Sequence, residues 1–203
     1  TIDIRMKGKV VCSKSVTIEL KDIEFFYRHF SVDRPNYQSF IEKTKGKYKY
    51  EPETNKMIMY VHGWNMEGEA VKKRWVETMF KRQYWQGYNG HVCLFDWDEL
   101  GLTGIFDSED HAWNSAYSLS TVIDFLNKNG YKDEIRIFAH SQGNVVVGEY
   151  LRSYAIEGDI KKYIASQAAI SAHFYDNSDL LKDFFKYNYP KIYGHYTDGK
   201  FDK

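Results

Sequence analysis

The first 55 residues carry the hydrophobic pattern of surface strands. Apolar and polar residues alternate over residues 1–11 and again over residues 15–20. A period of two places every second side chain on the same face, so both segments predict half-buried strands at the edge of a sheet. Residues 31–55 are mostly polar and predict a connecting loop, with a short helix over residues 37–44.

From Lys56 onward, short apolar runs alternate with longer amphipathic stretches. The apolar runs predict strands over residues 57–61, 92–97, 134–139 and 163–170. The amphipathic stretches predict helices over residues 67–86, 111–129, 142–156 and 179–187. Strands that alternate with helices at regular spacing predict a three-layer α/β sandwich, in which helices cover both faces of a mostly parallel central sheet.

Two predicted helices carry an apolar stripe that we expect to face this sheet. In residues 67–86 the stripe consists of Val71, Trp75 and Met79, and the basic residues on the other side are Lys72, Lys73 and Arg74. In residues 111–129 the stripe consists of Ala112, Ala116, Leu119, Ile123 and Leu126. Side chains that recur every three or four residues share one face of a helix, so both stripes predict core packing.

Composition and charge exclude several classes of protein. The 28 Lys and Arg residues balance the 28 Asp and Glu residues, so the chain lacks the basic excess of nucleic-acid-binding proteins, and we expect no nucleic-acid partner. No apolar run reaches the roughly 18 residues of a transmembrane segment. Aromatic residues make up 17% of the chain, enough for a large core. The aromatic residues that we expect in this core include Trp64, Trp75, Tyr84, Trp85 and Trp97.

The chain has two cysteines, Cys12 and Cys93, which are too few for a disulfide framework. Cys93 lies within the apolar run 92–95, which predicts a buried and unreactive thiol. The sequence begins with Thr1 rather than Met, and we therefore expect it to be a piece of a longer protein.

Residues 138–144 have the clearest chemical meaning. They read Phe-Ala-His-Ser-Gln-Gly-Asn and join a predicted strand to a predicted helix, with small residues two positions before and after Ser141, at Ala139 and Gly143. This is the pattern of a nucleophile elbow, in which a serine stands on a sharp bend between strand and helix. The free N–H groups at the start of the helix then face an oxyanion formed at the serine. Ser141 could instead be only a helix N-cap, but the strand before it and the helix after it favour the nucleophile.

A second feature supports this interpretation. The predicted strand 57–61 is followed directly by His62-Gly63-Trp64. In this architecture a backbone N–H just after an earlier strand supplies half of the oxyanion hole. We expect the N–H groups of Trp64 and Gln142 to form the hole, and Gly63 to let the chain approach the substrate closely. The alternative for His62 and Gly63 is a turn with a structural histidine. His140 is expected to pack or to line the pocket, because adjacent residues on a tight turn point apart.

Residues 60–64 (Tyr-Val-His-Gly-Trp) and 139–144 (Ala-His-Ser-Gln-Gly-Asn) resemble the α/β-hydrolase superfamily. The similarity covers about residues 56–176, and the segments that resemble an uncharacterised bacterial lipase/esterase-like branch are 80–88, 95–97, 107–113 and 167–170. The resemblance implies an α/β-hydrolase core over residues 56–203, with residues 1–55 as N-terminal strands and connecting loop of the same domain. It also implies a catalytic serine, acid and histidine in that order along the chain.

The histidine and the acid remain open at this point. Two histidines follow the serine, His173 and His195. One assignment makes His195 the base and Asp176 the acid. A second makes Asp198 the acid, with a histidine beyond the last residue, and a third places both partners beyond it. The resemblance implies more strand–helix units than the sequence contains, so we expect the C-terminal strands of the fold to be missing.

The remaining polar clusters change this picture little. Asp107, Glu109, Asp110 and His111 precede a predicted helix, and acids near its positive end are expected to cap it rather than to bind a metal. No metal-binding or phosphate-loop spacing occurs, and we expect neither a metal nor an organic cofactor. The sequence thus predicts a serine hydrolase that cleaves a small-molecule carboxylic ester. The alternatives are a non-catalytic binding or scaffolding module of the same fold, and an acyltransferase that uses the same serine.

Overall fold

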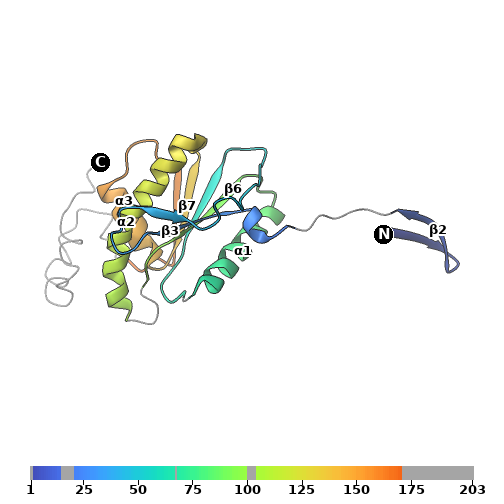
Figure 1. Ribbon diagram of the computed structural model, residues 1–203, viewed down its shortest axis with the longest axis horizontal. Helices are drawn as coiled ribbons and strands as arrows, with labels where there is room; N and C mark the ends of the chain where they lie inside the picture. The colour runs from blue at the N-terminus through green and yellow to red at the C-terminus, as the bar shows by residue number, and fades with distance from the viewer. Residues whose placement is uncertain (1, 15–20, 67, 100–103, 171–203) are drawn as a thin grey trace.

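The computed structural model describes residues 2–14, 21–66, 68–99 and 104–170 of the chain. Six strands form the main sheet, in the order β4-β3-β6-β5-β7-β8, and helices cover both faces (Figure 1). These strands are β3 (Arg28–Val32), β4 (Phe40–Glu42), β5 (Met57–Val61), β6 (His91–Asp96), β7 (Ile135–His140) and β8 (Lys162–Ser166). The helices are η1 (Ile23–Phe25), α1 (Glu69–Trp85), α2 (Ile105–Leu126), η2 (Asn127–Tyr131) and α3 (Gly143–Ser153).

The sheet is mostly parallel. Every neighbouring pair among β3, β6, β5, β7 and β8 runs parallel, whereas β4 runs antiparallel to β3. Each helix that links two of the later strands returns the chain to the same edge of the sheet, which is why strand–helix alternation produces parallel pairing. The fold is therefore the predicted three-layer α/β sandwich with a mostly parallel central sheet.

Two hydrophobic cores lie on opposite faces of this sheet. Along β5, Met57, Met59 and Val61 belong to the larger core beneath α2 and α3, whereas Tyr60 belongs to the smaller core beneath α1. Successive side chains of a strand point to opposite faces, so a strand covered on both faces must be apolar throughout. This requirement explains the continuous apolar run Met-Ile-Met-Tyr-Val.

The helix face is predicted correctly for α2 and in part for α1, where Trp75 and Met79 of the predicted stripe are partly buried against the smaller core. All five residues of the predicted α2 stripe are fully buried. In α1, however, the buried residues are Lys72, Val76 and Phe80, one position along from the predicted stripe. The three basic residues favour an exposed face, but Lys72 has carboxylate partners inside the protein and is only 8% exposed. Helix α2 also begins six residues before the predicted start, at Ile105.

The N-terminal predictions need more correction. Strands β1 (Ile2–Met6) and β2 (Lys9–Lys14) form a separate two-stranded hairpin rather than one edge strand, and Met6 in this hairpin is 65% exposed. Strand β3 lies in a segment without a predicted strand, and β4 occupies part of the segment predicted as a helix over residues 37–44. The predicted strand 15–20 and helix 179–187 lie outside the described residues.

Single-residue burial agrees with the sequence in part. Cys93 is fully buried, as predicted, and Trp97 is 1% exposed. The prediction that Tyr84 and Trp85 lie in the core is wrong, because they are 55% and 76% exposed at the end of α1. None of the helices in the described part of the chain combines the length and the apolar character needed to cross a membrane.

The carboxyl ends of the parallel strands meet at one edge of the sheet. Strand β5 ends at Val61, β6 at Asp96, β7 at His140 and β8 at Ser166. The segments that follow β5 and β7 are therefore neighbours, because these two strands are paired. In open α/β sheets this edge is where ligands bind, and both predicted halves of the site lie here.

Candidate active site

Ser141 stands on a strained bend between β7 and α3. Its φ is +51°, in the left-handed region that costs a non-glycine residue about 1–3 kcal/mol. Hydrogen bonds hold the bend in place. The Ser141 N–H donates to the Ser166 carbonyl at 3.0 Å, and the Ser141 carbonyl accepts from the backbone N–H groups of Asn144 at 3.0 Å and Ala169 at 3.2 Å. The bend leaves Ser141 partly exposed.

The bend packs directly against the turn after β5. A Cβ at Gly143 would lie 2.5 Å from the His62 carbonyl oxygen and 2.7 Å from that of Val61, so only glycine fits. A Cβ at Gly63 would lie 3.1 Å from the Ser141 Cβ and 2.9 Å from the His140 Nδ1. The structure thus brings together the two segments that the sequence singles out, 62–64 and 140–143.

The residue after the serine is fixed by its side chain. Gln142 is 2% exposed, and its Oε1 accepts from the Ser108 hydroxyl at 2.7 Å while its Nε2 donates to the Ile105 carbonyl at 2.6 Å. These contacts join the start of α2 to the start of α3. Within the described residues, the backbone N–H groups of Gln142 and Trp64 meet no protein acceptor.

His140 precedes the serine and turns toward β8. Its Nε2 lies 2.8 Å from the Gln167 Oε1, at an exposed position. Gln167 itself has a φ of +44°, so the chain bends sharply at the ends of both β7 and β8. His140 therefore lies at the rim of the site, with one ring nitrogen engaged by Gln167.

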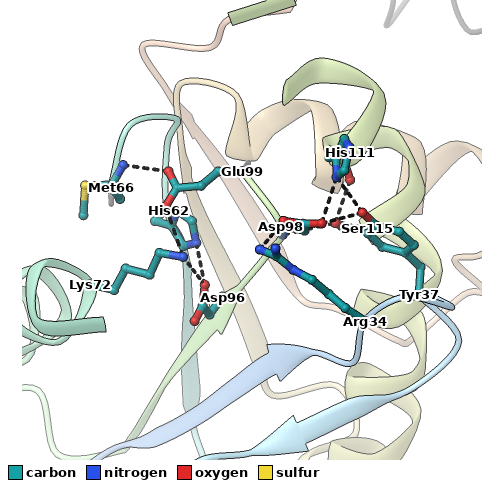
Figure 2. A network of polar contacts seen from close by, with 10 residues as sticks. All are labelled: Arg34, Tyr37, His62, Met66, Lys72, Asp96, Asp98, Glu99, His111 and Ser115. Atoms are coloured by element: carbon teal, nitrogen blue, oxygen red, sulfur yellow. Dashed lines mark hydrogen bonds and ion pairs between the residues drawn. The ribbon is translucent and has the colours of Figure 1, made fainter. Parts of the chain in front are cut away.

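A buried ionic network supports the turn over residues 62–66 (Figure 2). The fully buried His62 lies with its Nε2 3.2 Å from Asp96 Oδ1, which also accepts from Lys72 Nζ at 2.6 Å. Lys72 lies 3.1 Å from Glu99 as well, and Glu99 Oε2 accepts from the Met66 N–H at 2.6 Å. The network therefore holds the turn at both its first and its last residue.

The charges in this network stabilise one another. Burial alone would raise the pKa of Asp96, but hydrogen bonds from His29 and His62 and the charge of Lys72 hold it well below its usual range. Burial would likewise lower the pKa of Lys72, yet Asp96 and Glu99 raise it. Both carboxylates accept hydrogen bonds, which compensates for their removal from water.

Comparison with protein families adds the evolutionary relationship. A family model described as "Alpha/beta hydrolase of unknown function (DUF900)" matches residues 40–191. The chain belongs to this DUF900 family. The match spans the strands of the main sheet from β4 to β8, the helices between them, the turn after β5 and the Ser141 bend. No curated protein and no solved structure matches the chain.

A second polar network in this DUF900 chain lies beside the first (Figure 2). Asp98, which is 3% exposed, pairs with Arg34, accepts from the Tyr37 hydroxyl at 2.5 Å and lies 2.8 Å from His111 Nδ1. Burial, together with the hydrogen bond to Asp98, raises the pKa of Tyr37. This network joins the β3–β4 loop to α2 and gives His111 a carboxylate partner.

A groove on this side of the DUF900 chain lies apart from the serine. It has a volume of about 550 Å³ and is lined by residues of the β3–β4 loop, α2 and α3, namely Asn36, Tyr37, Gln38, Trp113, Asn114, Tyr117, Glu149 and Tyr154. None of these residues belongs to the Ser141 bend or to the turn after β5. Among the described residues, no cluster of three or more His, Cys, Asp or Glu side chains could hold a metal ion.

The other predicted catalytic residues lie outside the described part of the chain. His195, Asp176 and the alternative acid Asp198 all follow residue 170, as does His173. The supporting role of Lys72, Asp96 and Glu99 is not predicted from the sequence. The available signal is the Asp-Trp-Asp-Glu segment that ends β6 and follows it, since acidic residues directly after a buried strand must find partners at the carboxyl edge.

Proposed function

We propose that this DUF900 chain is a serine hydrolase that cleaves a small-molecule carboxylic ester through an acyl-enzyme on Ser141. The observation that supports the proposal most directly is the bend at Ser141, which is strained, partly exposed and packed against Gly63. Strain of this kind persists only where surrounding contacts impose it, and it concentrates at functional sites.

In the proposed mechanism, Ser141 Oγ attacks the ester carbonyl and a histidine accepts the serine proton. The carbonyl oxygen becomes an oxyanion that the N–H groups of Trp64 and Gln142 stabilise. The histidine then protonates the departing alcohol, which leaves an acyl group on Ser141. Water, deprotonated by the same histidine, attacks the acyl group, and the histidine returns this proton to Ser141 Oγ as the acid is released.

We propose His195 as the base and Asp176 as the residue that orients it. Serine oxygen is a weak nucleophile without an adjacent base, so the proposal requires a histidine next to Ser141. His62 cannot supply this base, because it is fully buried and its ring contacts Asp96 and Gly63. The reaction as written uses neither a metal nor an organic cofactor.

Labelling with a fluorophosphonate tests the nucleophile. We expect covalent labelling of the full chain at Ser141, detected by mass spectrometry of the peptides, and no labelling of Ser141→Ala. Ser120→Ala changes a serine on the outer part of α2, whose hydroxyl bonds to the Tyr117 carbonyl, and should label like the original chain. Equal labelling of the original chain and Ser141→Ala would remove Ser141 from the mechanism.

His195→Gln tests the base. If His195 accepts the serine proton, its loss slows labelling by at least about 100-fold, the usual contribution of a general base. Unchanged labelling of this variant would exclude His195. Turnover of p-nitrophenyl esters by the original chain tests the ester class, and acceleration by an added alcohol, with a new ester as product, would favour the acyltransferase.

A further inference from the structure

Both ring nitrogens of His62 face hydrogen-bond acceptors. Nδ1 lies 2.8 Å from the Gly63 carbonyl oxygen, and Nε2 lies 3.2 Å from Asp96 Oδ1. A carbonyl oxygen cannot donate, and the Asp96 carboxylate is an acceptor as well, because it also accepts from the Lys72 ammonium at 2.6 Å. A neutral imidazole has one N–H group and can satisfy only one of these acceptors. Both contacts are hydrogen bonds only if His62 carries two protons and a positive charge.

The charges around His62 agree with this state. The Asp96 carboxylate from β6 faces the His62 ring directly. Asp96 also contacts Lys72 from α1 and His29 from β3, and Lys72 pairs with Glu99 from the segment after β6. Two carboxylates and one ammonium leave a net charge of −1, which a His62 cation neutralises. Such neutralisation removes most of the cost of burying these groups away from water.

His29 shows the contrast within the same network. Its Nε2 lies 3.1 Å from Asp96 Oδ2, but its buried Nδ1 has no hydrogen-bond partner among the described residues. A buried N–H without an acceptor is costly, so the geometry around His29 offers an acceptor to one ring nitrogen, whereas the geometry around His62 offers acceptors to both. Asp96 thus contacts two histidines that differ in the number of acceptors their rings face.

The Nδ1 contact of His62 also orients the next peptide. The Gly63 carbonyl and the Trp64 N–H belong to one planar trans peptide, in which the two groups point in opposite directions. When His62 holds the carbonyl oxygen, the Trp64 N–H points away from the ring. Gly63 itself packs so closely against the serine that a Cβ at this position would lie only 3.1 Å from the Ser141 Cβ.

We propose that His62 is a buried imidazolium that positions the Gly63–Trp64 peptide, so that the Trp64 N–H faces the oxyanion formed at Ser141. This proposal rests on the proposed function. His62 is a positioning residue in it: it acts through the peptide, and its charge also favours negative charge at the nearby oxyanion. Lys72, Glu99 and the Trp97 indole, whose N–H donates to the His62 carbonyl at 2.7 Å, keep the turn and its histidine in place.

The charge state can be measured without any activity. We would label the histidines of the full chain with ¹⁵N and record long-range ¹H–¹⁵N spectra at pH 7.5, with His62 assigned by its loss in His62→Asn. The expected result is two protonated ring nitrogens on His62. A neutral tautomer, with one unprotonated nitrogen, would overturn the proposal whether or not Ser141 reacts.

The positioning role needs two variants. Asn at position 62 keeps a side-chain N–H near the place of Nδ1 and can donate to the Gly63 carbonyl, whereas Leu cannot. We expect His62→Leu to lower kcat for a p-nitrophenyl ester by about 10–100-fold with little change in KM, somewhat less than the loss of an oxyanion donor itself. His62→Asn should recover most of this loss. Circular dichroism checks that both variants fold.

The outcomes separate the two proposals. If the original chain neither labels nor turns over, the proposed function fails, and the ¹⁵N spectra still decide the charge of His62. If the chain is active and His62→Leu matches it, the positioning role is excluded. If His62→Leu does not fold, His62→Gln replaces it, because the longer Gln amide reaches the place of Nε2 and not that of Nδ1. A fall in kcat for His62→Gln that His62→Asn does not show supports positioning by the Nδ1 donor, and equal rates for the two variants contradict it.

Discussion

A histidine lies near each end of β6, His91 at its amino end and His62 beside Asp96 at its carboxyl end, and different groups face the two rings. At the amino end, His91 Nδ1 accepts from the Tyr48 hydroxyl, and burial together with the charge of Arg28 lowers the pKa of His91 to about 4. At the carboxyl end, His62 faces a carboxylate and a carbonyl. Donors around a ring keep it neutral, whereas acceptors around a ring favour its cation.

The two ends of β6 therefore differ in role: the amino end contributes packing, and the carboxyl end supports the candidate site. The amino end packs tyrosine rings around His91, with the ring of Tyr131 4.9 Å away, and no part of the Ser141 site lies there. The carboxyl end holds paired charges beside the turn that packs against Ser141. A charged group that is costly to bury is thus found where it supports the candidate site, and the uncharged histidine is found where only packing is required.

The largest effect should follow from breaking the charges at the carboxyl end. Lys72→Met leaves Asp96 and Glu99 without their ammonium partner, and we expect a loss of about 3–5 kcal/mol in the free energy of unfolding. Lys73→Met is the control on the same helix, because Lys73 pairs with Glu24 and Glu69 near the surface and should contribute less than about 1 kcal/mol. Urea denaturation measures both, and similar losses would contradict the distinction.

A smaller loss should follow from filling the contact between the Ser141 bend and the turn after β5. Gly143→Ala places a methyl group against two backbone carbonyls, so we expect about 1–3 kcal/mol of destabilisation and a large fall in fluorophosphonate labelling. Gly104→Ala is the control, since among the described residues its Cβ would meet nothing closer than Asp107 Oδ2 at 3.5 Å. Normal labelling of Gly143→Ala would show that this contact can open without disturbing the serine.

The smallest effect concerns His91. Its pKa is about 6.5 in an unfolded chain and about 4 in the folded one, so the unfolded chain binds more protons between these values. Stability is therefore full above pH 6.5 and falls as the pH drops toward 4. Because the ring is only half-buried, we expect a loss of about 1 kcal/mol between pH 7 and pH 5. His91→Gln should reduce this loss in urea melts, and an unchanged pH dependence would contradict the role of His91.

Much of the fold can be predicted from the sequence because doubly covered strands leave a clear signal. Strand β5 is apolar on both faces, and the bend at Ser141 has small residues where strand and helix crowd together. Strand β3 escapes prediction because it contains Arg28 and His29. Their partners, Glu42 and Asp96, lie 14 and 67 residues away in the sequence, so no local pattern reveals that Arg28 is partly buried and His29 fully buried.

The same limit applies to the candidate site. The serine and the turn after β5 can be found from short motifs, since their geometry depends on neighbouring residues. The role of Lys72 cannot be found from a short motif, because Lys72 stands in a run of three basic residues. Only the folded protein shows that its partners Asp96 and Glu99 lie inside. Long-range ion pairs are set by tertiary structure, so polar residues that support a site are harder to predict than the nucleophile.

The hydrogen bonds of the Ser141 bend have one more consequence. The bend is anchored to the segment 166–169, at the end of β8, by the Ser141 N–H and the Ser141 carbonyl. A peptide, crosslink or neighbouring chain that displaced this segment would release the strained backbone at the serine. Under the proposed function, the reactivity of Ser141 would then respond to events at the β8 margin of the sheet.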